Sequence, residues 1–277
     1  MERGRSPHRG RRSGIPLLTA VAIAAAAAGT PAAPQRPGDL YQTTVIVTGT
    51  DSRSRPIGFA EALRKVLVNL SGEPRLHDDP RVSALAARAG AAVASFSYVD
   101  RMAGRPVHDE QGTRDRPYNF TVTFVPARVD KMLETLGQHA WTGTRPAVVP
   151  VLAVTIGPTS YLLSAETPHG TEQRASFQDM ARDFDLTVRF PADAELAAWG
   201  VPTAGFPAPP SAAAPNDAVV AGTLRFDESL PGWVGSWRWR WHGATYGWRI
   251  KGVSFDEAFR DICRGVLRVA SGHGAPD

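Results

Sequence analysis

Hydrophobic and polar residues alternate over residues 40–48, which is the two-residue period of a β-strand with one buried face. The residues that share this face are Tyr41, Thr43, Val45 and Val47. The period then changes to that of a helix, which ends at Ser71-Gly72 because glycine suits the left-handed position after a helix. The apolar stripe that predicts this helix consists of Phe59, Leu63, Val66, Leu67 and Leu70.

A second helix is predicted to begin at Asp79-Pro80, because aspartate caps helix N-termini and proline fits the first helical position. Its apolar positions continue at helical spacing as far as Phe96. Residues 118–124 alternate between apolar and polar side chains, which predicts a half-buried strand, and a short helix is expected over 129–136. The apolar positions of the second helix are Val82, Leu85, Ala86, Ala89, Val93 and Phe96.

Residues 147–156 are almost all apolar and predict a strand that is buried on both faces. Pro150 lies inside this strand and cannot donate to a neighbour, so we expect a sheet edge, a bulge or a strand start there. Residues 200–217 contain five prolines and many alanines, which predicts a loop. Between these segments the pattern predicts a helix at 172–183, a strand at 186–190 and a short helix at 192–199.

The C-terminal residues predict a strand at 219–226 and then a hairpin, with strands 236–241 and 246–250 around residues 242–245. The last helix begins with Ser254 and Glu257, which form a capping box. Its buried stripe consists of Phe255, Phe259, Ile262, Val266 and Val269.

Strands and helices therefore alternate in two successive groups. This order predicts an α/β or α+β fold, in which helices pack on a mixed β-sheet. We expect two small layered units, over residues 34–145 and 146–272, with the connector at Arg145-Pro146 between them. The Ala/Pro-rich loop 200–217 belongs to the second unit.

Residues 1–33 have the three parts of a secretory signal peptide. Five arginines precede an uncharged apolar stretch, and small residues follow it, so we expect cleavage near Ala28 or Ala33. The stretch is shorter than the roughly 20 residues that span a bilayer, although a retained N-terminal anchor is the alternative. Arg11-Arg12 leaves the twin-arginine route open beside the general secretion route. We expect a periplasmic protein with no transmembrane span after signal cleavage.

The positive charge of the chain lies in the predicted signal peptide. The whole sequence has 31 Lys and Arg against 27 Asp and Glu, and residues 1–33 hold five arginines and one glutamate. Removing that segment leaves 26 residues of each sign, so the mature chain is formally neutral. Nucleic-acid-binding proteins concentrate Lys and Arg in a basic patch, and this chain has no long basic run. We therefore expect no nucleic-acid partner.

Local catalytic and metal-binding motifs are absent from the sequence. There is no Gly-x-Ser-x-Gly elbow, His-Glu-x-x-His helix, phosphate-binding loop or Gly-x-Gly-x-x-Gly run. Cys263 is the single cysteine, and its apolar neighbours favour a buried thiol over a reactive one. His77, beside Asp78 and Asp79, is the best acid–base cluster, but Asp79 already serves as a helix cap. We predict no catalytic residue, metal ligand or cofactor.

Motifs along the mature chain resemble a bacterial family known as domain of unknown function 2066. In order, they are Leu40-Tyr41 with Val45 and Val47, Ala60 to Gly72, Tyr118 to Phe124, Trp141 to Pro146, Gly222, the Trp-rich hairpin and the terminal helix. The resemblance covers about residues 40–270 and implies an exported envelope protein of Gram-negative bacteria, without an established activity. The second half also looks loosely like the N-terminal α/β domains of periplasmic proteins such as TolB. Loop 200–217 departs from the family pattern.

The hairpin is the strongest local feature of the sequence. Trp237, Trp239 and Trp241 alternate with Arg238 and Arg240, so a strand places the indoles on one face and the guanidinium groups on the other. In one interpretation the indole face is buried under the terminal helix and the arginine face is solvated. In the other the hairpin binds a ligand, because indoles stack on sugars or peptides and arginines grip carboxylates or phosphates.

Two further residues complete the candidate binding set. Trp233 follows Pro231-Gly232, so we expect it to be the more exposed indole. Arg145 lies at the connector, where it pairs with a buried carboxylate, fixes the connector or contacts a ligand. The candidate binding residues are Trp233, Arg238, Arg240 and Arg145.

The sequence favours a non-enzymatic periplasmic protein that binds an envelope protein or a cell-wall component. One alternative is a periplasmic hydrolase with catalytic residues dispersed along the chain, which requires a pocket with convergent ionisable groups. The other alternative is a binder of small lipids or glycans through the Trp-rich hairpin, which requires exposed indoles.

Overall fold

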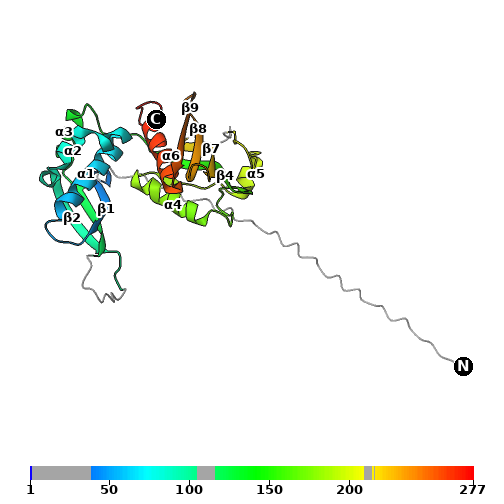
Figure 1. The fold of residues 1–277 in the computed structure, drawn as a ribbon, viewed down its shortest axis with the longest axis horizontal. Coiled ribbons are helices and arrows are strands. Elements are labelled where there is room, and N and C mark those ends of the chain that lie inside the picture. Colours follow the sequence, from blue (N-terminus) through cyan, green and yellow to red (C-terminus); the bar gives the residue numbers. More distant parts are fainter. Residues whose placement is uncertain (2–38, 105–115, 209–213, 215) are drawn as a thin grey trace. The chain divides into compact units, whose positions relative to one another are not determined.

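The computed structural model describes residues 39–104, 116–208 and 216–277, together with Met1 and Ala214. Residues 2–38, which hold nearly all of the predicted signal peptide, residues 105–115 and part of the loop 200–217 lie outside the described residues. Figure 1 shows helices packed on two β-sheets, which is the expected α/β or α+β architecture.

The first sheet has three antiparallel strands in the order β1-β3-β2. One of its faces carries Val45, Phe120 and Val122, which pack with Leu63 and Leu67 of helix α1 in the hydrophobic core. The elements are η1 (Asp39–Tyr41), β1 (Gln42–Thr48), α1 (Arg55–Ser71), η2 (Pro74–Asp78), α2 (Pro80–Ala86), η3 (Ala89–Ala92), β2 (Val93–Asp100), β3 (Pro117–Phe124) and α3 (Pro126–Thr135).

The prediction of one long helix from Asp79-Pro80 to Phe96 is wrong in its second half. Helix α2 begins as expected, with the Asp79 side chain accepting a hydrogen bond from the backbone N–H of Arg81, but it ends at Ala86. Residues from Val93 onward form strand β2, in which Phe96 lies opposite Val122. Cross-strand packing against β3 therefore outweighs the helical spacing of the apolar residues.

The second sheet follows the order β5-β4-β7-β8-β9, and the short strand β6 also pairs with β4. Strand β4 runs parallel to β7, and the β7–β8 and β8–β9 pairs are antiparallel. The elements are β4 (Ala147–Ile156), β5 (Thr159–Leu162), α4 (Thr171–Asp183), β6 (Thr187–Val188), α5 (Asp193–Ala198), β7 (Asp217–Asp227), β8 (Gly232–Trp241), β9 (Ala244–Val253) and α6 (Phe255–Ala270).

Pro150 lies in the middle of β4, where the sheet has a local edge. One side of β4 pairs with β7 along nearly its whole length, and Pro150 lies opposite Val220. The other side pairs with β6 at Val148 and with β5 only from Ala153 onward. The missing N–H of Pro150 therefore costs no ladder hydrogen bond on the unpaired side.

Helices cover the two faces of the second sheet unequally (Figure 1). Helices α4 and α6 lie on one face, and their Phe177 and Phe259 rings stack with centroids 4.6 Å apart. On the other face, Leu196 of α5 packs on Val149, Val151, Val219 and Ala221, which all belong to β4 and β7. Strands β8 and β9 have no helix on that second face among the described residues.

Helix α6 also contacts the end of α1. The guanidinium group of Arg268 pairs with the carboxylate of Glu73, and both side chains are nine-tenths buried. The Ser271 hydroxyl donates a hydrogen bond of 2.9 Å to the backbone oxygen of Gly72. One hydrophobic core includes residues from both sheets. The boundary between units at residues 145 and 146 stays a prediction.

Among the described residues, no helix is long and apolar enough to cross a membrane.

Gly265 of α6 provides a test of how closely this helix packs on the sheet. A Cβ atom at this position would lie 2.6 Å from the Trp248 ring. In an ordinary helix, Gly→Ala stabilises by about 1 kcal/mol, but here we expect Gly265→Ala to lower the free energy of unfolding by about 1–3 kcal/mol. Urea denaturation measures this change.

The matched control is Gly247→Ala in β9, where the nearest atom to a new Cβ is the Trp237 backbone oxygen at 3.6 Å. This control should change stability by less than about 0.5 kcal/mol. A Gly265→Ala variant that is more stable than the wild type would contradict the close packing of α6 on Trp248.

Candidate functional site

Four tryptophans of the β8–β9 hairpin are buried on the face toward helix α6, and Trp241 at the end of β8 is half-buried. The exposed fractions of Trp237, Trp239 and Trp248 are 2%, 1% and 6%. Trp237 and Trp248 lie opposite each other in the two strands, so their rings share one face. Of the two interpretations of this hairpin, the structure agrees with burial of the indole face under the terminal helix.

Trp233 is a correction to the sequence analysis. We expected it to be the more exposed indole, but it is only 8% exposed. Strand β8 begins at Gly232, so Trp233 already lies on the inner face with the other indoles. Its ring meets Phe255 of α6 edge-on, with centroids 6.1 Å apart. Trp233, Trp237, Trp239 and Trp248 therefore offer no exposed surface on which a lipid or glycan could stack, and the half-buried Trp241 packs against the Trp239 ring with centroids 4.9 Å apart.

The turn of the hairpin is tighter than the predicted four-residue connection. Only His242 and Gly243 separate β8 from β9. Both have positive φ angles, 45° and 83°, which is the geometry of the two-residue type I′ turn. This turn fixes the register of the two strands and therefore decides which side chains share a face.

Four exposed cations gather on the outer face of the hairpin. Arg238 and Arg240 alternate with the buried indoles and are exposed. The register places Arg249 opposite Ser236 and Lys251 opposite Val234, on the same outer face. We call Arg238, Arg240, Arg249 and Lys251 the basic face.

No acidic residue of the described chain neutralises the basic face. None of its four side chains forms an ion pair or a hydrogen bond with another described residue, whereas the neighbouring Arg225 pairs with Asp227 at 2.7 Å. The Arg238 guanidinium lies over the Phe206 ring, 4.8 Å from its centroid, which leaves its charge uncompensated. The basic face therefore presents positive charge to solvent in a chain that is neutral after residue 33.

Arg145 lies at the connector and not on the basic face. Its Nη2 donates a hydrogen bond of 2.6 Å to the backbone oxygen of Asn69, near the end of α1. Its guanidinium group stacks over the Trp141 ring, 4.7 Å from the centroid. Burial lowers the pKa of Arg145, and the nearby Asp185 opposes that shift. These contacts give Arg145 a role in fixing the connector.

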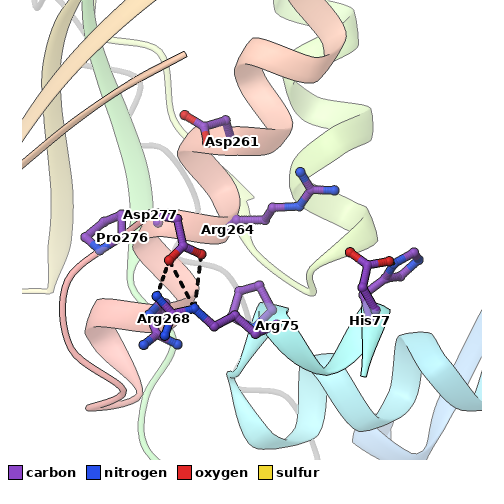
Figure 2. A pocket seen from close by; sticks show the side chains of 10 residues that line it. Arg75, His77, Asp261, Arg264, Arg268, Pro276 and Asp277 are labelled. Atoms are coloured by element: carbon purple, nitrogen blue, oxygen red, sulfur yellow. Dashed lines mark hydrogen bonds and ion pairs between the residues drawn. The ribbon is translucent and has the colours of Figure 1, made fainter. Parts of the chain in front are cut away.

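A cleft of about 210 Å³ lies between η2 and the C-terminal half of α6 (Figure 2). Its cations are held in ion pairs within the chain, since Arg75 pairs with Asp277 and Arg264 pairs with Glu257. His77 contacts Asp78 at 2.8 Å between Nδ1 and Oδ1. The ionisable side chains that line the cleft are Arg75, His77, Asp78, Asp261, Arg264, Arg268 and Asp277.

Asp261 links this cleft to the buried indoles. Its carboxyl accepts a hydrogen bond of 2.9 Å from the Trp237 indole N–H. The Trp248 indole N–H is close enough to lower the pKa of this carboxyl, but it makes no hydrogen bond of standard geometry with a described residue. Burial has the largest effect and raises the pKa of Asp261 to about 6.

The described residues offer no cluster of three or more His, Cys, Asp and Glu side chains that could hold a metal ion. Cys263 is fully buried, as its apolar neighbours predict, and burial raises the pKa of its thiol. A buried thiol of raised pKa is a poor nucleophile.

Sequence reasoning missed Arg249, Lys251 and Asp261. The two cations of β9 could have been assigned to the face of Arg238 if the two-residue turn at His242-Gly243 had been recognised, because that turn sets the register. Nothing in the helical spacing around Asp261 indicates that a carboxyl would meet two indoles from a different element.

The comparisons with known proteins concern the N-terminal part of the chain. Residues 35–142 match the family model of a domain of unknown function (DUF8605). The expectation that the chain contains a domain of unknown function is therefore confirmed. The family is DUF8605, however, and not domain of unknown function 2066, so the resemblance to the latter is corrected. The motifs behind it are apolar strand and helix patterns, which unrelated folds share. No curated protein and no solved structure matches the chain.

The raised pKa of Asp261 predicts a pH-dependent stability. The folded chain holds the proton of Asp261 up to about pH 6, whereas an unfolded chain releases it near 3.8. The contribution of Asp261 to stability is therefore greatest below pH 3.8 and is lost as the pH rises to 6. Because the side chain retains some solvent contact, we expect this loss to be about 1–2 kcal/mol.

Asp261→Asn removes the titrating group. Its free energy of unfolding, relative to the wild type, should therefore rise by about 1–2 kcal/mol between pH 4 and pH 6.5, as measured by urea denaturation at each pH. Glu134→Gln, at an exposed carboxylate of α3, is the control and should show a constant difference from the wild type. A constant difference for Asp261→Asn as well would contradict the raised pKa.

Proposed function

We propose that this chain is an exported, periplasmic and non-enzymatic binding or adaptor protein of the cell envelope, and that it binds an acidic envelope protein through the basic face. The N-terminal pattern of arginines, apolar residues and small residues supports export. The absence of local catalytic motifs from the sequence supports a binding role.

The observation that carries the proposal is the absence of acidic partners from the basic face within the described chain. Residues that alternate along a strand lie about 7 Å apart, so Arg238 and Arg240 repel each other. Such repulsion contributes nothing to folding, and an acidic partner would relieve it. Most of the cations are arginines, whose planar guanidinium groups bind carboxylates in a bidentate manner.

The shape of the surface favours a protein over a small ligand. The basic face is the outer face of a two-stranded hairpin, and its four side chains line none of the best-formed pockets of the described residues. Small ligands bind in concave sites, whereas protein interfaces are broad and enriched in arginine. Binding to a cell-wall polymer or an anionic membrane is the alternative outcome of the test below.

The test is crosslinking in living cells, followed by purification of a C-terminally tagged chain from the envelope fraction. Arg238→Ala/Arg240→Ala should reduce recovery of the crosslinked protein partner by about tenfold or more, because it removes two charge-pairing side chains. The difference in recovery between the wild type and this double variant should decrease at higher salt concentration, because salt screens the interaction.

The matched control is Arg88→Ala/Lys131→Ala, which removes the same charge from exposed positions outside the basic face. This control should recover the partner at the wild-type level. Equal recovery by both double variants would contradict the role of the basic face, and recovery of wall fragments or lipid alone would replace the protein partner.

A second candidate function is hydrolysis by dispersed residues, and Asp261 favours it. A carboxyl with a pKa of about 6 beside Arg264, in a cleft that His77 also lines, is suited to general acid–base chemistry near neutral pH. The hydrogen bond from Trp237 and the internal pairing of the cleft arginines give these groups structural roles instead. For that reason we place binding first.

A further inference from the structure

Resting on the proposed function, we propose that the acidic partner binds as an extended segment added to the free edge of β9. The acidic side chains of this segment then meet the basic face, and its backbone extends the second sheet by one strand. The four cations alone do not determine whether a partner binds through its side chains or also through its backbone, and strand addition uses both.

The free edge of β9 is long. Strand β9 is the last strand of the β5-β4-β7-β8-β9 order, and β8 is its partner among the described strands. It runs for 10 residues, from Ala244 to Val253. In an antiparallel edge strand, alternate residues direct their N–H and C=O groups outward, where another strand can pair with them.

The other sheet edges are less suited to an acidic strand. At β1, the Lys65 ammonium group already donates to the backbone oxygen of Thr44 and pairs with Asp183 at 2.7 Å. Strand β5 has four residues, and β2 contains no Lys or Arg. The edge of β9 therefore combines length with unpaired positive charge.

The side chains of β9 define the sequence of a matching strand. Arg249 and Lys251 lie on the outer face, while the half-buried Tyr246 and Ile250 lie on the inner face beside the core. Side chains directly opposite each other in neighbouring strands have Cβ atoms about 5 Å apart. An added strand with alternating acidic and apolar residues would place its carboxylates beside the cations and its apolar side chains beside Tyr246 and Ile250.

Charged residues on an edge strand also protect sheets from aggregation, and the test must separate that role from partner binding. The probe is a fluorescent 10-residue peptide of alternating Glu and Val, and its affinity for the mature chain is measured by fluorescence polarisation. Two further peptides carry N-methyl groups on every Glu or on every Val. Successive N–H groups of a strand point to opposite edges, so each methylated peptide blocks one edge.

We expect one of the two methylated peptides to bind at least tenfold more weakly than the parent and the other to keep its affinity. A peptide of the same composition with its glutamates clustered should also bind at least tenfold more weakly. Arg249→Ala/Lys251→Ala should weaken the parent peptide, whereas Arg88→Ala/Lys131→Ala should not.

Equal affinity of the two methylated peptides overturns strand addition. If that binding still depends on the cations of the basic face, the proposed function stands without it. If the peptide does not bind but a crosslinked partner depends on Arg238 and Arg240, strand addition is rejected and the proposed function stands. Peptide binding that is insensitive to all four cations rejects both proposals.

Discussion

The burial of the hairpin indoles beneath helix α6 determines how the terminal helix packs on the second sheet. Trp237 donates its indole N–H to Asp261, and Trp248 packs against Gly265 one helical turn later. A buried indole N–H usually finds a hydrogen-bond partner, and the Asp261 carboxyl accepts the N–H of Trp237. Burial raises the pKa of this carboxyl, and the hydrogen bond opposes that shift. These contacts fix the distance and the orientation of α6 on the sheet. The same helix then reaches the end of α1 through the buried pair of Arg268 and Glu73.

The exposure of the basic face follows directly from this burial. Side chains alternate along a strand, so a hairpin that buries its tryptophans must turn Arg238 and Arg240 to the other side. Helix α5 and its neighbours cover β4 and β7 on that side, but they leave β8 and β9 without a helix among the described residues. The hairpin thus buries one face in the core and exposes the other, and the surface that we propose to bind a partner lies directly on that core.

The sequence predicts much of the fold, because most elements have a clear period. The strand at 147–156, the helix at 172–183 and the capped helix after Ser254 all occur as expected, and Ser254 accepts a hydrogen bond of 3.2 Å from the Glu257 N–H. Prediction fails where neighbours decide the outcome. Phe96 has helical spacing but pairs with β3, and Trp233 follows a turn-like Pro-Gly but is covered by Phe255. Half of the basic face could be predicted from alternation in β8, while its β9 half requires the register set by the turn.

Contact between the basic face and an envelope partner can be measured by arginine-specific covalent labelling, read residue by residue, on the chain in its envelope fraction and after purification. We expect Arg238, Arg240 and Arg249 to be labelled less in the envelope fraction than in the purified chain, and the exposed Arg53 and Arg88 to be labelled equally in both. Unchanged labelling of the three arginines, or protection that falls elsewhere on the chain, would contradict contact through the basic face.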